Sequence, residues 1–201
     1  MTAPATPQTP QTASVKDSIE GRRAVRRYTA EAPSQELIDE VARLALEAPS
    51  AFNAQMRDLY VVTDDATKQA LYEASNQRQF LEAPVVFVVA ARTEAVTDDV
   101  EGLLGEQRAQ VFASFRSGMS PEKLREASIK DAMLVAGFLL VAAQSVGLAT
   151  SPTTGWDEEK VKEAIGLGGR EDRAIGLVIA AGFPNESPAH PGRAESRLHR
   201  I

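Results

Sequence analysis

The sequence predicts one layered domain of mixed α/β or α+β class. A chain of 201 residues, 43% of them hydrophobic, is long enough for a single domain with a substantial core. Two continuous apolar runs, VVFVVAA after Pro84 and AIGLVIAAGFP from Ala174, are typical of strands covered on both faces. Segments with helical spacing lie before and between these runs. Helices interleaved with a few buried strands indicate a layered α and β architecture.

The first half of the chain predicts a tail, three helices or helix-like segments and two strands. Residues 1–14 are small, polar and proline-rich, which is typical of a flexible tail, so we take 15–201 as the domain. A short helix is expected over 16–27, running into an arginine cluster and ending near Tyr28 and Thr29. Ser34 caps a clearer helix to Glu47. The remaining elements are a strand over 59–62, a helix over 65–74 and the buried strand over 85–91.

The second half is dominated by one long helix, expected from Glu122 to Val146. Its part AMLVAGFLLVAA, residues 132–143, is apolar nearly all round, which favours a core helix or one covered by a partner subunit. This run of 12 residues is too short to cross a bilayer, which needs about 20. The other expected elements are a helix-compatible region over 100–117, an uncharged loop over 148–156, a short helix capped by Asp157, the strand from Ala174 and a polar tail over 185–201.

Composition excludes several kinds of chemistry. The formal charge of −6 argues against general attraction to nucleic acid or an anionic membrane. No cysteine is present, and the two histidines, His190 and His199, both lie near the C-terminus, so metal clusters and a Ser-His-Asp triad are poorly supported. The N-terminus lacks the pattern of a secretory signal, and we expect a cytoplasmic protein. This composition, without cysteine and with few histidines, suits an enzyme that uses an organic cofactor and equally a non-catalytic binding protein.

Two local motifs can carry chemistry. GRRAVRR places Arg22, Arg23, Arg26 and Arg27 within six residues, and the arginine fork of donors matches phosphate oxygens. The alternative is a solvated basic face. APSAFNAQ, residues 48–55, offers hydroxyl and amide groups for a heterocycle, or forms an ordinary polar turn. No P-loop is present, and GLGGR at 166–170 lacks the spacing of a dinucleotide fingerprint.

Taken together, five motifs in order resemble the nitroreductase-like family of FMN-dependent oxidoreductases, over about residues 18 to 201. They are RRAVR, PSAFNAQ followed by LYVV, Asn76-Gln77 ahead of the central strand, SPTTGW closed by Asp157, and LVIAAGFP with its arginine tail. The resemblance implies a three-layer α-β-α domain with a central mixed, mainly antiparallel sheet and an intertwined homodimer. It also implies a C-terminal arm, about 185–201, that reaches the partner subunit.

The resemblance assigns a role to each matched position. Arg22 and Arg23 would grip the FMN phosphate and ribityl chain. Arg26 would face the N1/O2 edge of the isoalloxazine, where reduction concentrates negative charge. The backbone N–H of Thr154 would lie near N5, and Ser50 and Asn53 would come from the partner. The full implied set of cofactor contacts is Arg22, Arg23, Ala24, Arg26, Ser50, Ala51, Asn53, Asn76, Gln79, Pro152, Thr153, Thr154, Gly155 and Arg193, with Arg197 the alternative to Arg193.

Three departures from the family pattern stand out. Ala24 replaces a serine that would donate to the phosphate, Gln79 replaces a lysine found in some members near N1, and 56–58 replaces the common Pro-Trp-(Arg/His).

The implied activity is ping-pong transfer of hydride from NADH or NADPH through flavin N5 to a nitroaromatic, quinone or enone. Phe112 and Phe115 are candidate cover for the acceptor, with a core role as the alternative. A flavin-dependent dehydrogenase, a flavin-degrading enzyme and a non-catalytic flavin or phospho-ligand binder remain open.

Overall fold

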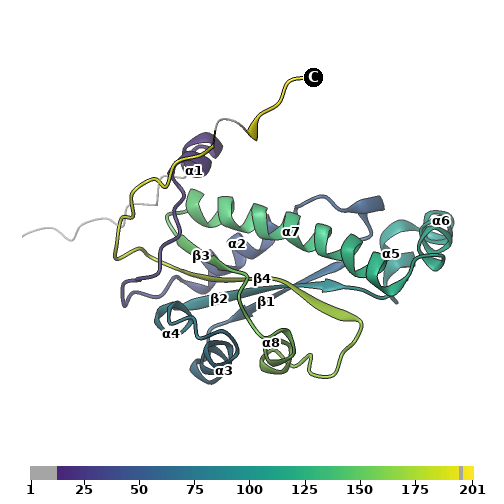
Figure 1. Cartoon of the computed structure of the whole chain (residues 1–201), viewed down its shortest axis with the longest axis horizontal. Coiled ribbons are helices and arrows are strands. Elements are labelled where there is room, and N and C mark those ends of the chain that lie inside the picture. Colours follow the sequence, from purple (N-terminus) through teal and green to yellow (C-terminus); the bar gives the residue numbers. More distant parts are fainter. Residues whose placement is uncertain (1–12, 195–196) are drawn as a thin grey trace, which may run out of the picture.

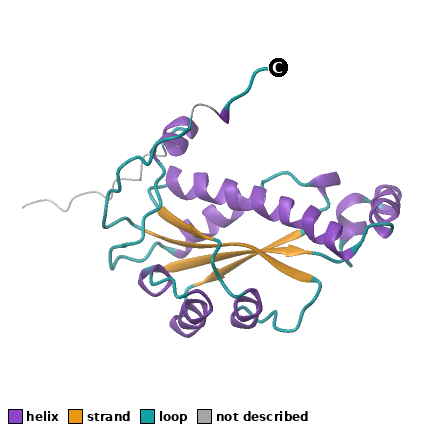
Figure 2. Ribbon diagram, viewed as in Figure 1, coloured by secondary structure: helices purple, strands orange, loops and turns teal. Residues whose placement is uncertain are grey.

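The protein is a three-layer sandwich, in which helices cover both faces of one sheet (Figure 1). The structure, a computed structural model, describes residues 13–194 and 197–201. Nearly all of the expected N-terminal tail therefore lies outside the described residues. Figure 2 shows α2 and α7 on one side of the sheet and α3, α4 and α8 on the other. Two clusters of buried side chains, one on each face of the sheet, form the core.

The sheet contains four strands in the order β1-β2-β4-β3. Every ladder between these strands is antiparallel, and an isolated bridge between Ala24 and Thr150 adds a parallel pairing. This arrangement confirms the predicted α+β class. The strands are β1 (Arg57–Val62), β2 (Val85–Arg92), β3 (Ala149–Thr153) and β4 (Arg173–Gly182). In β2, the residues from Val85 to Ala91 are fully buried, as their continuous hydrophobicity predicts.

The helices agree with most of the expected segments. Ser34 caps α2 by accepting from the N–H of Leu37, and Asp157 caps α8 by accepting from the N–H of Lys160. The helices are α1 (Val15–Gly21), α2 (Gln35–Leu46), α3 (Asp65–Ser75), α4 (Gln79–Glu82), α5 (Val100–Leu104), α6 (Glu106–Ser117), α7 (Pro121–Ser145) and α8 (Glu158–Ala164), with a 3-10 turn η1 (Ala51–Asn53). The expected region 100–117 is two helices, because Gly105 has a φ of 75° between them.

Two expectations are wrong in detail. The helix expected over 16–27 ends at Gly21, because the next residues pair with the sheet instead: the N–H of Val25 donates to the carbonyl of Thr150 over 3.0 Å. The loop expected over 148–156 contains strand β3, because the free edge of β4 offers backbone partners to it. Pro152 has no N–H to donate, and β3 tolerates it as an edge strand of the sheet.

Helix α7 has one buried face and one exposed apolar face. Val135, Ala136 and Leu139 are buried against the sheet, which confirms the predicted core helix for this face. On the other face Phe138 is 43% exposed, and it lines an apolar hollow of about 430 Å³ together with Val15 and Ile19 of α1. Within the part of the chain that the structure describes, no helix is long and apolar enough to span a membrane.

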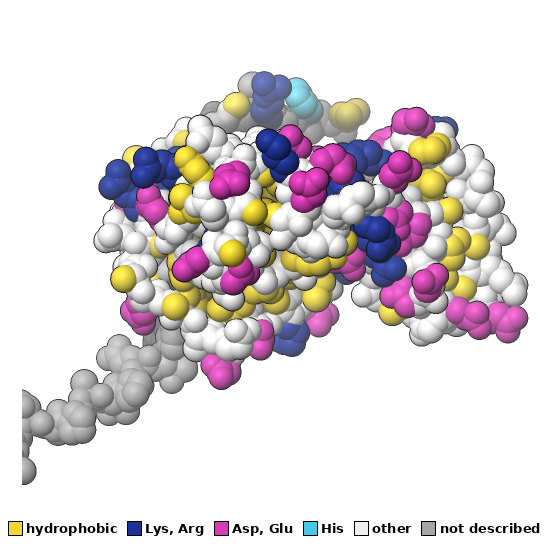
Figure 3. All heavy atoms as spheres, turned by 90° about the horizontal axis from the view of Figure 1, so that it is seen from below, with side chains coloured by type: hydrophobic (Ala, Val, Ile, Leu, Met, Phe, Trp, Pro, Cys, Tyr) yellow, Lys and Arg dark blue, Asp and Glu magenta, His cyan; other side chains and the backbone are white. Residues whose placement is uncertain are grey.

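The α5–α6 pair projects from the body of the domain, at the end of the sheet away from α1 (Figure 1). Seen from the layer of α3, α4 and α8, the surface carries acidic and basic side chains interspersed, with apolar patches between them (Figure 3). The two ends of the domain therefore differ: one holds α1 and the C-terminal segment, and the other holds the projecting helices.

Candidate functional site

The arginine cluster lies in an extended segment, residues 22–28, beside the sheet. Ala24 bridges to Thr150 of β3, and the N–H of Thr29 donates to the carbonyl of Phe183 over 2.9 Å, just after β4. Tyr28 is buried, and its hydroxyl donates to the carbonyl of Val25 over 2.7 Å. These backbone and hydroxyl contacts fix the segment, so that its arginine side chains are displayed at one end of the sheet.

Arg22 carries an unmet hydrogen-bond donor. Its Nη1 is buried, and no described residue accepts a hydrogen bond from it. Burial lowers the pKa of Arg22, and the nearby positive charges of Arg193 and Arg23 lower it further. The hydroxyl of Thr150, on the strand that bridges to Ala24, is likewise buried without a partner among the described residues. Three guanidinium groups around an unmet buried donor fit a phosphate group.

A polar hollow of about 510 Å³ contains Arg26 and Gln79 in its lining. Gln79 is buried, and its Nε2 donates to Oε1 of Gln77 over 2.9 Å and to Oγ1 of Thr153 over 3.2 Å. These bonds join α4 to the end of β3. The carboxylate of Glu186 accepts from the N–H of Arg26 over 2.6 Å, which fixes the backbone on the other side of the hollow. The hollow can therefore hold the polar edge of a heterocycle.

The structure brings together most of the predicted cofactor-binding residues that lie in the arginine segment, α4, β3 and the C-terminal segment. The charges of Arg193 and Arg23 lower the pKa of Arg22, and Gln79 contacts Thr153 directly. The following residues, Thr154 and Gly155, are exposed beyond the end of β3. Asn76 is exposed at the end of α3 with a φ of 55°, and Arg197 is exposed in the C-terminal segment.

The other predicted cofactor-binding residues, Ser50, Ala51 and Asn53, lie in the loop around η1. The hydroxyl of Ser50 accepts from the N–H of Gln55 over 3.0 Å, which closes the loop on itself. Phe52, Asn53 and Gln55 have φ values of 58°, 61° and 52°, in the left-handed region that non-glycine residues rarely adopt. Such residues cost on the order of 1–3 kcal/mol each and persist only where surrounding contacts hold them. The loop therefore stores strain beside its predicted binding residues.

Sequence reasoning missed Phe52, which joins the two candidate phenylalanines. Its ring lies 5.6 Å from that of Phe112 and 5.5 Å from that of Phe115, measured between centroids. Phe112 is 1% exposed and packs in a small core with Ala54 and other buried side chains. Phe115 and Phe52 are 56% and 40% exposed. The signal for Phe52 was its position inside APSAFNAQ, between two predicted binding residues.

The two groups lie at different places along α7. Near its end, the carbonyl of Ser145 accepts from the N–H of Ala13, just before α1 and the arginine segment. Fourteen residues earlier, Asp131 accepts from the N–H of Ala51 in the η1 loop. At a rise of about 1.5 Å per residue, these two points are roughly 20 Å apart along the helix. Within one chain, the arginine group and the η1 loop are therefore separate.

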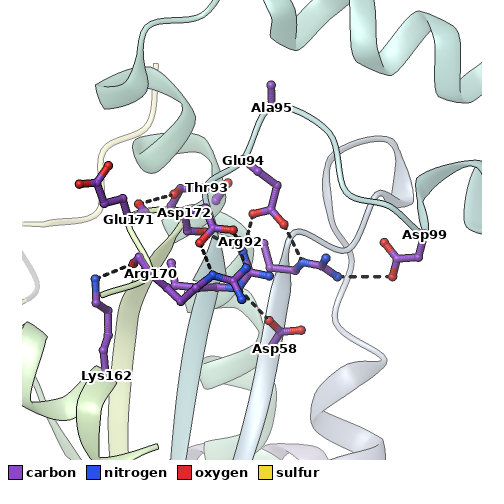
Figure 4. A network of polar contacts seen from close by, with 12 residues as sticks. Asp58, Arg92, Thr93, Glu94, Ala95, Asp99, Lys162, Arg170, Glu171 and Asp172 are labelled. Carbon is purple, nitrogen blue, oxygen red and sulfur yellow. Dashed lines mark hydrogen bonds and ion pairs between the residues drawn. The ribbon is translucent and has the colours of Figure 1, made fainter. Parts of the chain in front are cut away.

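The start of β4 carries a third polar group, which is internally paired (Figure 4). Arg173 is within 3.6 Å of Asp58, 2.8 Å of Glu94 and 2.9 Å of Asp172. A hydrogen bond from Arg170 is the main cause that lowers the pKa of Asp172 to about 2. These ion pairs join β1, β2 and β4 and serve the fold. Among residues 13–194 and 197–201, no group of three or more His, Asp or Glu side chains is placed to hold a metal ion.

The structure defines an α-β-α protein with a group of arginines beside its sheet, and comparisons give its family. The sequence model of the nitroreductase family matches residues 19–183. A protein named NADH dehydrogenase from Thermus thermophilus is 37% identical, over 84% of this chain and 87% of the relative. Protein DrgA of Synechocystis is 29% identical, over 90% and 88%. The chain therefore belongs to the nitroreductase family, which confirms the family indicated by its motifs.

Solved structures agree on the fold. A nitroreductase-like protein from Exiguobacterium sibiricum, solved in complex with FMN, superposes with a TM-score of 0.84 at 22% identity, covering 94% of this chain and 97% of that chain. An enone reductase of gut-bacterial fatty acid metabolism, CLA-ER, gives a TM-score of 0.80 at 21% identity, over 93% and 96%. At these identities the likeness concerns the fold alone.

Proposed function

We propose that this member of the nitroreductase family is an FMN-dependent oxidoreductase, which takes electrons from NADH or NADPH and reduces a small electron acceptor. The observation that carries the proposal is the unmet buried donor of Arg22, with two further arginines beside it and a polar hollow next to Arg26. The relative named NADH dehydrogenase supports the electron donor, and the neighbour solved with FMN supports the cofactor.

Each residue of the arginine group has a distinct task in this proposal. Arg22, Arg23 and Arg193 hold the FMN phosphate by charge-assisted hydrogen bonds. Arg26 faces the edge of the flavin ring that becomes anionic on reduction and stabilises that charge. Gln79 and the backbone from Pro152 to Gly155 support the ring, with the N–H of Thr154 near N5. When bound, FMN supplies the two-electron chemistry, accepting hydride from the nicotinamide and passing the electrons on.

We further propose a homodimer, in which each cofactor site uses both chains. The chain just before α1 contacts α7 at Ser145 and the η1 loop contacts it at Asp131, roughly 20 Å apart along the helix, which supports the assignment of the two groups to different flavins. The apolar hollow between α1 and α7, with Phe138 at its surface, offers the kind of face that a second copy covers. In this arrangement Ser50, Ala51 and Asn53 serve the partner's cofactor, and part of the C-terminal arm reaches across.

The acceptor in this proposal is a planar molecule such as a nitroaromatic, a quinone or an enone. Phe52 and Phe115 present exposed aromatic rings 5.5 Å apart, which can stack on such a molecule. If donor and acceptor use one face of the flavin in turn, initial-rate plots at several donor concentrations should give the parallel lines of ping-pong kinetics.

Anaerobic titration of the purified protein tests the proposal. We expect a yellow protein, or a colourless one that takes up FMN on dialysis. Its flavin absorbance band, at about 450 nm, should disappear on adding NADH or NADPH. A protein that gains no FMN refutes the flavoenzyme assignment. A protein that binds FMN but stays oxidised with both donors is a flavin binder or another kind of oxidoreductase. A panel of acceptors added to the reduced protein then identifies the acceptor class.

A further inference from the structure

The η1 loop is held by contacts from outside itself. It contains three left-handed residues and no glycine between Ser50 and Met56, so its conformation is one that the free chain rarely visits. Internal hydrogen bonds close the loop, from the N–H of Gln55 to the hydroxyl of Ser50 and from the N–H of Asn53 to the carbonyl of Ser50. Such internal bonds do not orient the loop on the domain, which requires an anchor in the core.

Asp131 of α7 provides such an anchor. Its side chain is buried, with 6% of the residue exposed, and Oδ1 accepts from the N–H of Ala51 over 3.3 Å. Ala51 stands at the start of the strained stretch, directly before the left-handed Phe52. The carboxylate therefore holds the start of the loop to the middle of α7.

Two buried arginines flank this carboxylate. Arg57 donates from Nη2 to the carbonyls of Leu46 and Ala48, at 3.1 and 2.7 Å, and so fixes the chain that enters the loop. Its Nε and Nη1 are buried and find no acceptor among the described residues. On the other side, Arg116 lies 5.3 Å above the ring of Phe112. A buried carboxylate is costly unless such charges and donors surround it.

The surroundings of Asp131 shape its ionisation. Burial raises its pKa above the ordinary range, while the bond from Ala51 and the charges of Arg57 and Arg116 act in the opposite direction. An apolar residue here would avoid this desolvation, but it would leave the N–H of Ala51 without this acceptor. The specific contribution of the carboxylate is thus its hydrogen bond to the loop.

We propose that Asp131 is a positioning residue, which clamps the η1 loop so that Ser50 and Asn53 are presented to the cofactor bound by the partner subunit. The inference rests on the proposed function for the identity of that cofactor. The clamp itself is a property of the apoprotein, and it can be measured separately.

Three variants separate positioning from general stability. Asp131→Ala removes the hydrogen bond from Ala51, whereas Asp131→Asn keeps one oxygen that can accept it. Ser128→Ala is the matched control, because Ser128 is a buried polar residue one turn earlier on α7 and contacts Arg116 instead of the loop. If Asp131→Ala does not fold, Asp131→Ser replaces it, since a serine side chain is shorter than that of aspartate and does not extend to the amide of Ala51. For each dimer we would measure melting temperature, FMN dissociation constant and amide hydrogen exchange of residues 50–56.

Asp131→Ala should bind FMN roughly tenfold more weakly, the loss expected for one unmet buried hydrogen bond. The amide of Ala51 should exchange faster, and Asp131→Asn should recover most of the FMN affinity. Ser128→Ala should lose melting temperature while keeping both FMN affinity and loop protection.

Wild-type affinity and unchanged exchange in Asp131→Ala overturn the proposal, as does an equal loss of FMN affinity in Ser128→Ala or no recovery in Asp131→Asn. If wild type binds no FMN but Asp131→Ala still loosens the loop, the clamp stands and the proposed function fails.

Discussion

Replacing Arg22 by alanine should weaken FMN binding without weakening the apoprotein. Among the described residues its buried Nη1 finds no acceptor, so a bound anion can supply the missing partner. A hydrogen bond to a charged group contributes about 1.5–3 kcal/mol. Since about 1.4 kcal/mol is tenfold in a dissociation constant, Arg22→Ala should bind FMN roughly ten- to hundredfold more weakly.

The apoprotein should respond in the opposite direction. Burial, Arg193 and Arg23 all lower the pKa of Arg22, so the folded protein disfavours its charge when no anion is present. Removing the charge should therefore leave the melting temperature of the apoprotein unchanged or slightly raised. A residue that merely stabilised the fold would lower it.

Fluorescence titration of the apoprotein with FMN, combined with thermal unfolding with and without FMN, measures both effects. Arg125→Ala is the control, because Arg125 pairs with Glu158 near the start of α7, far along the helix from the arginine site. Its FMN affinity should equal that of wild type. Unchanged FMN affinity in Arg22→Ala, or a loss matched by Arg125→Ala, refutes the assignment of Arg22 to the phosphate.

Three further predictions concern the fold and the assembly. Gly182→Ala should destabilise the protein by about 1–3 kcal/mol, because the added Cβ would lie 2.6 Å from Cδ of Pro84, whereas Gly102→Ala, with nothing within 4 Å, should be neutral or stabilising. Phe138→Asp should split the dimer in sedimentation, because it places a charge on the apolar face between the copies. The lowered pKa of Asp172, about 2, stabilises the folded state above its unfolded pKa of about 3.9. Stability should therefore fall as pH drops from about 4 towards 2, and Asp172→Asn should flatten that slope.

Each of these predictions has a clear contrary result. Equal melting temperatures for the two glycine variants would mean that the chain around Pro84 shifts to accommodate the added Cβ without a loss of stability. A Phe138→Asp protein that sediments as wild type would place the interface elsewhere, or show that no dimer forms. An acid unfolding slope that is the same with and without Asp172 would show that solvent screens its ion pairs, which are largely exposed.

Periodicity and capping were sufficient for the regular elements of the fold. Helix α2 and strand β2 follow their sequence patterns closely, because the apolar residues of each pattern are the ones that the element buries in the structure. Strand β3 was missed because an edge strand containing Pro152 has neither alternation nor a continuous apolar run. The early end of α1 was missed because the pairing of Val25 with Thr150 joins residues 125 positions apart, and no local signal reports it.

The candidate site, like the fold, contains residues that the sequence predicts and residues that it does not. The arginines were visible in the sequence because their chemistry is carried by residue type, and phosphate requires that type. Asp131 was not visible, because a lone acidic residue on an otherwise apolar helix face looks like a solvated position. Its burial and its contact with Ala51 exist only once α7 packs beside the η1 loop.

The position of Asp131 also bears on why a buried charge is retained here. A hydrophobic residue at this position would suit the core better, since desolvation of the carboxylate opposes folding. The left-handed residues of the η1 loop add a further cost. Both costs fall on the same few residues, at the place where Phe52 meets the rings of α6 and where Ser50 and Asn53 are displayed. The buried carboxylate and the left-handed residues therefore place two costs in stability at the loop that we propose for binding, which is what selection for binding at the expense of stability would leave.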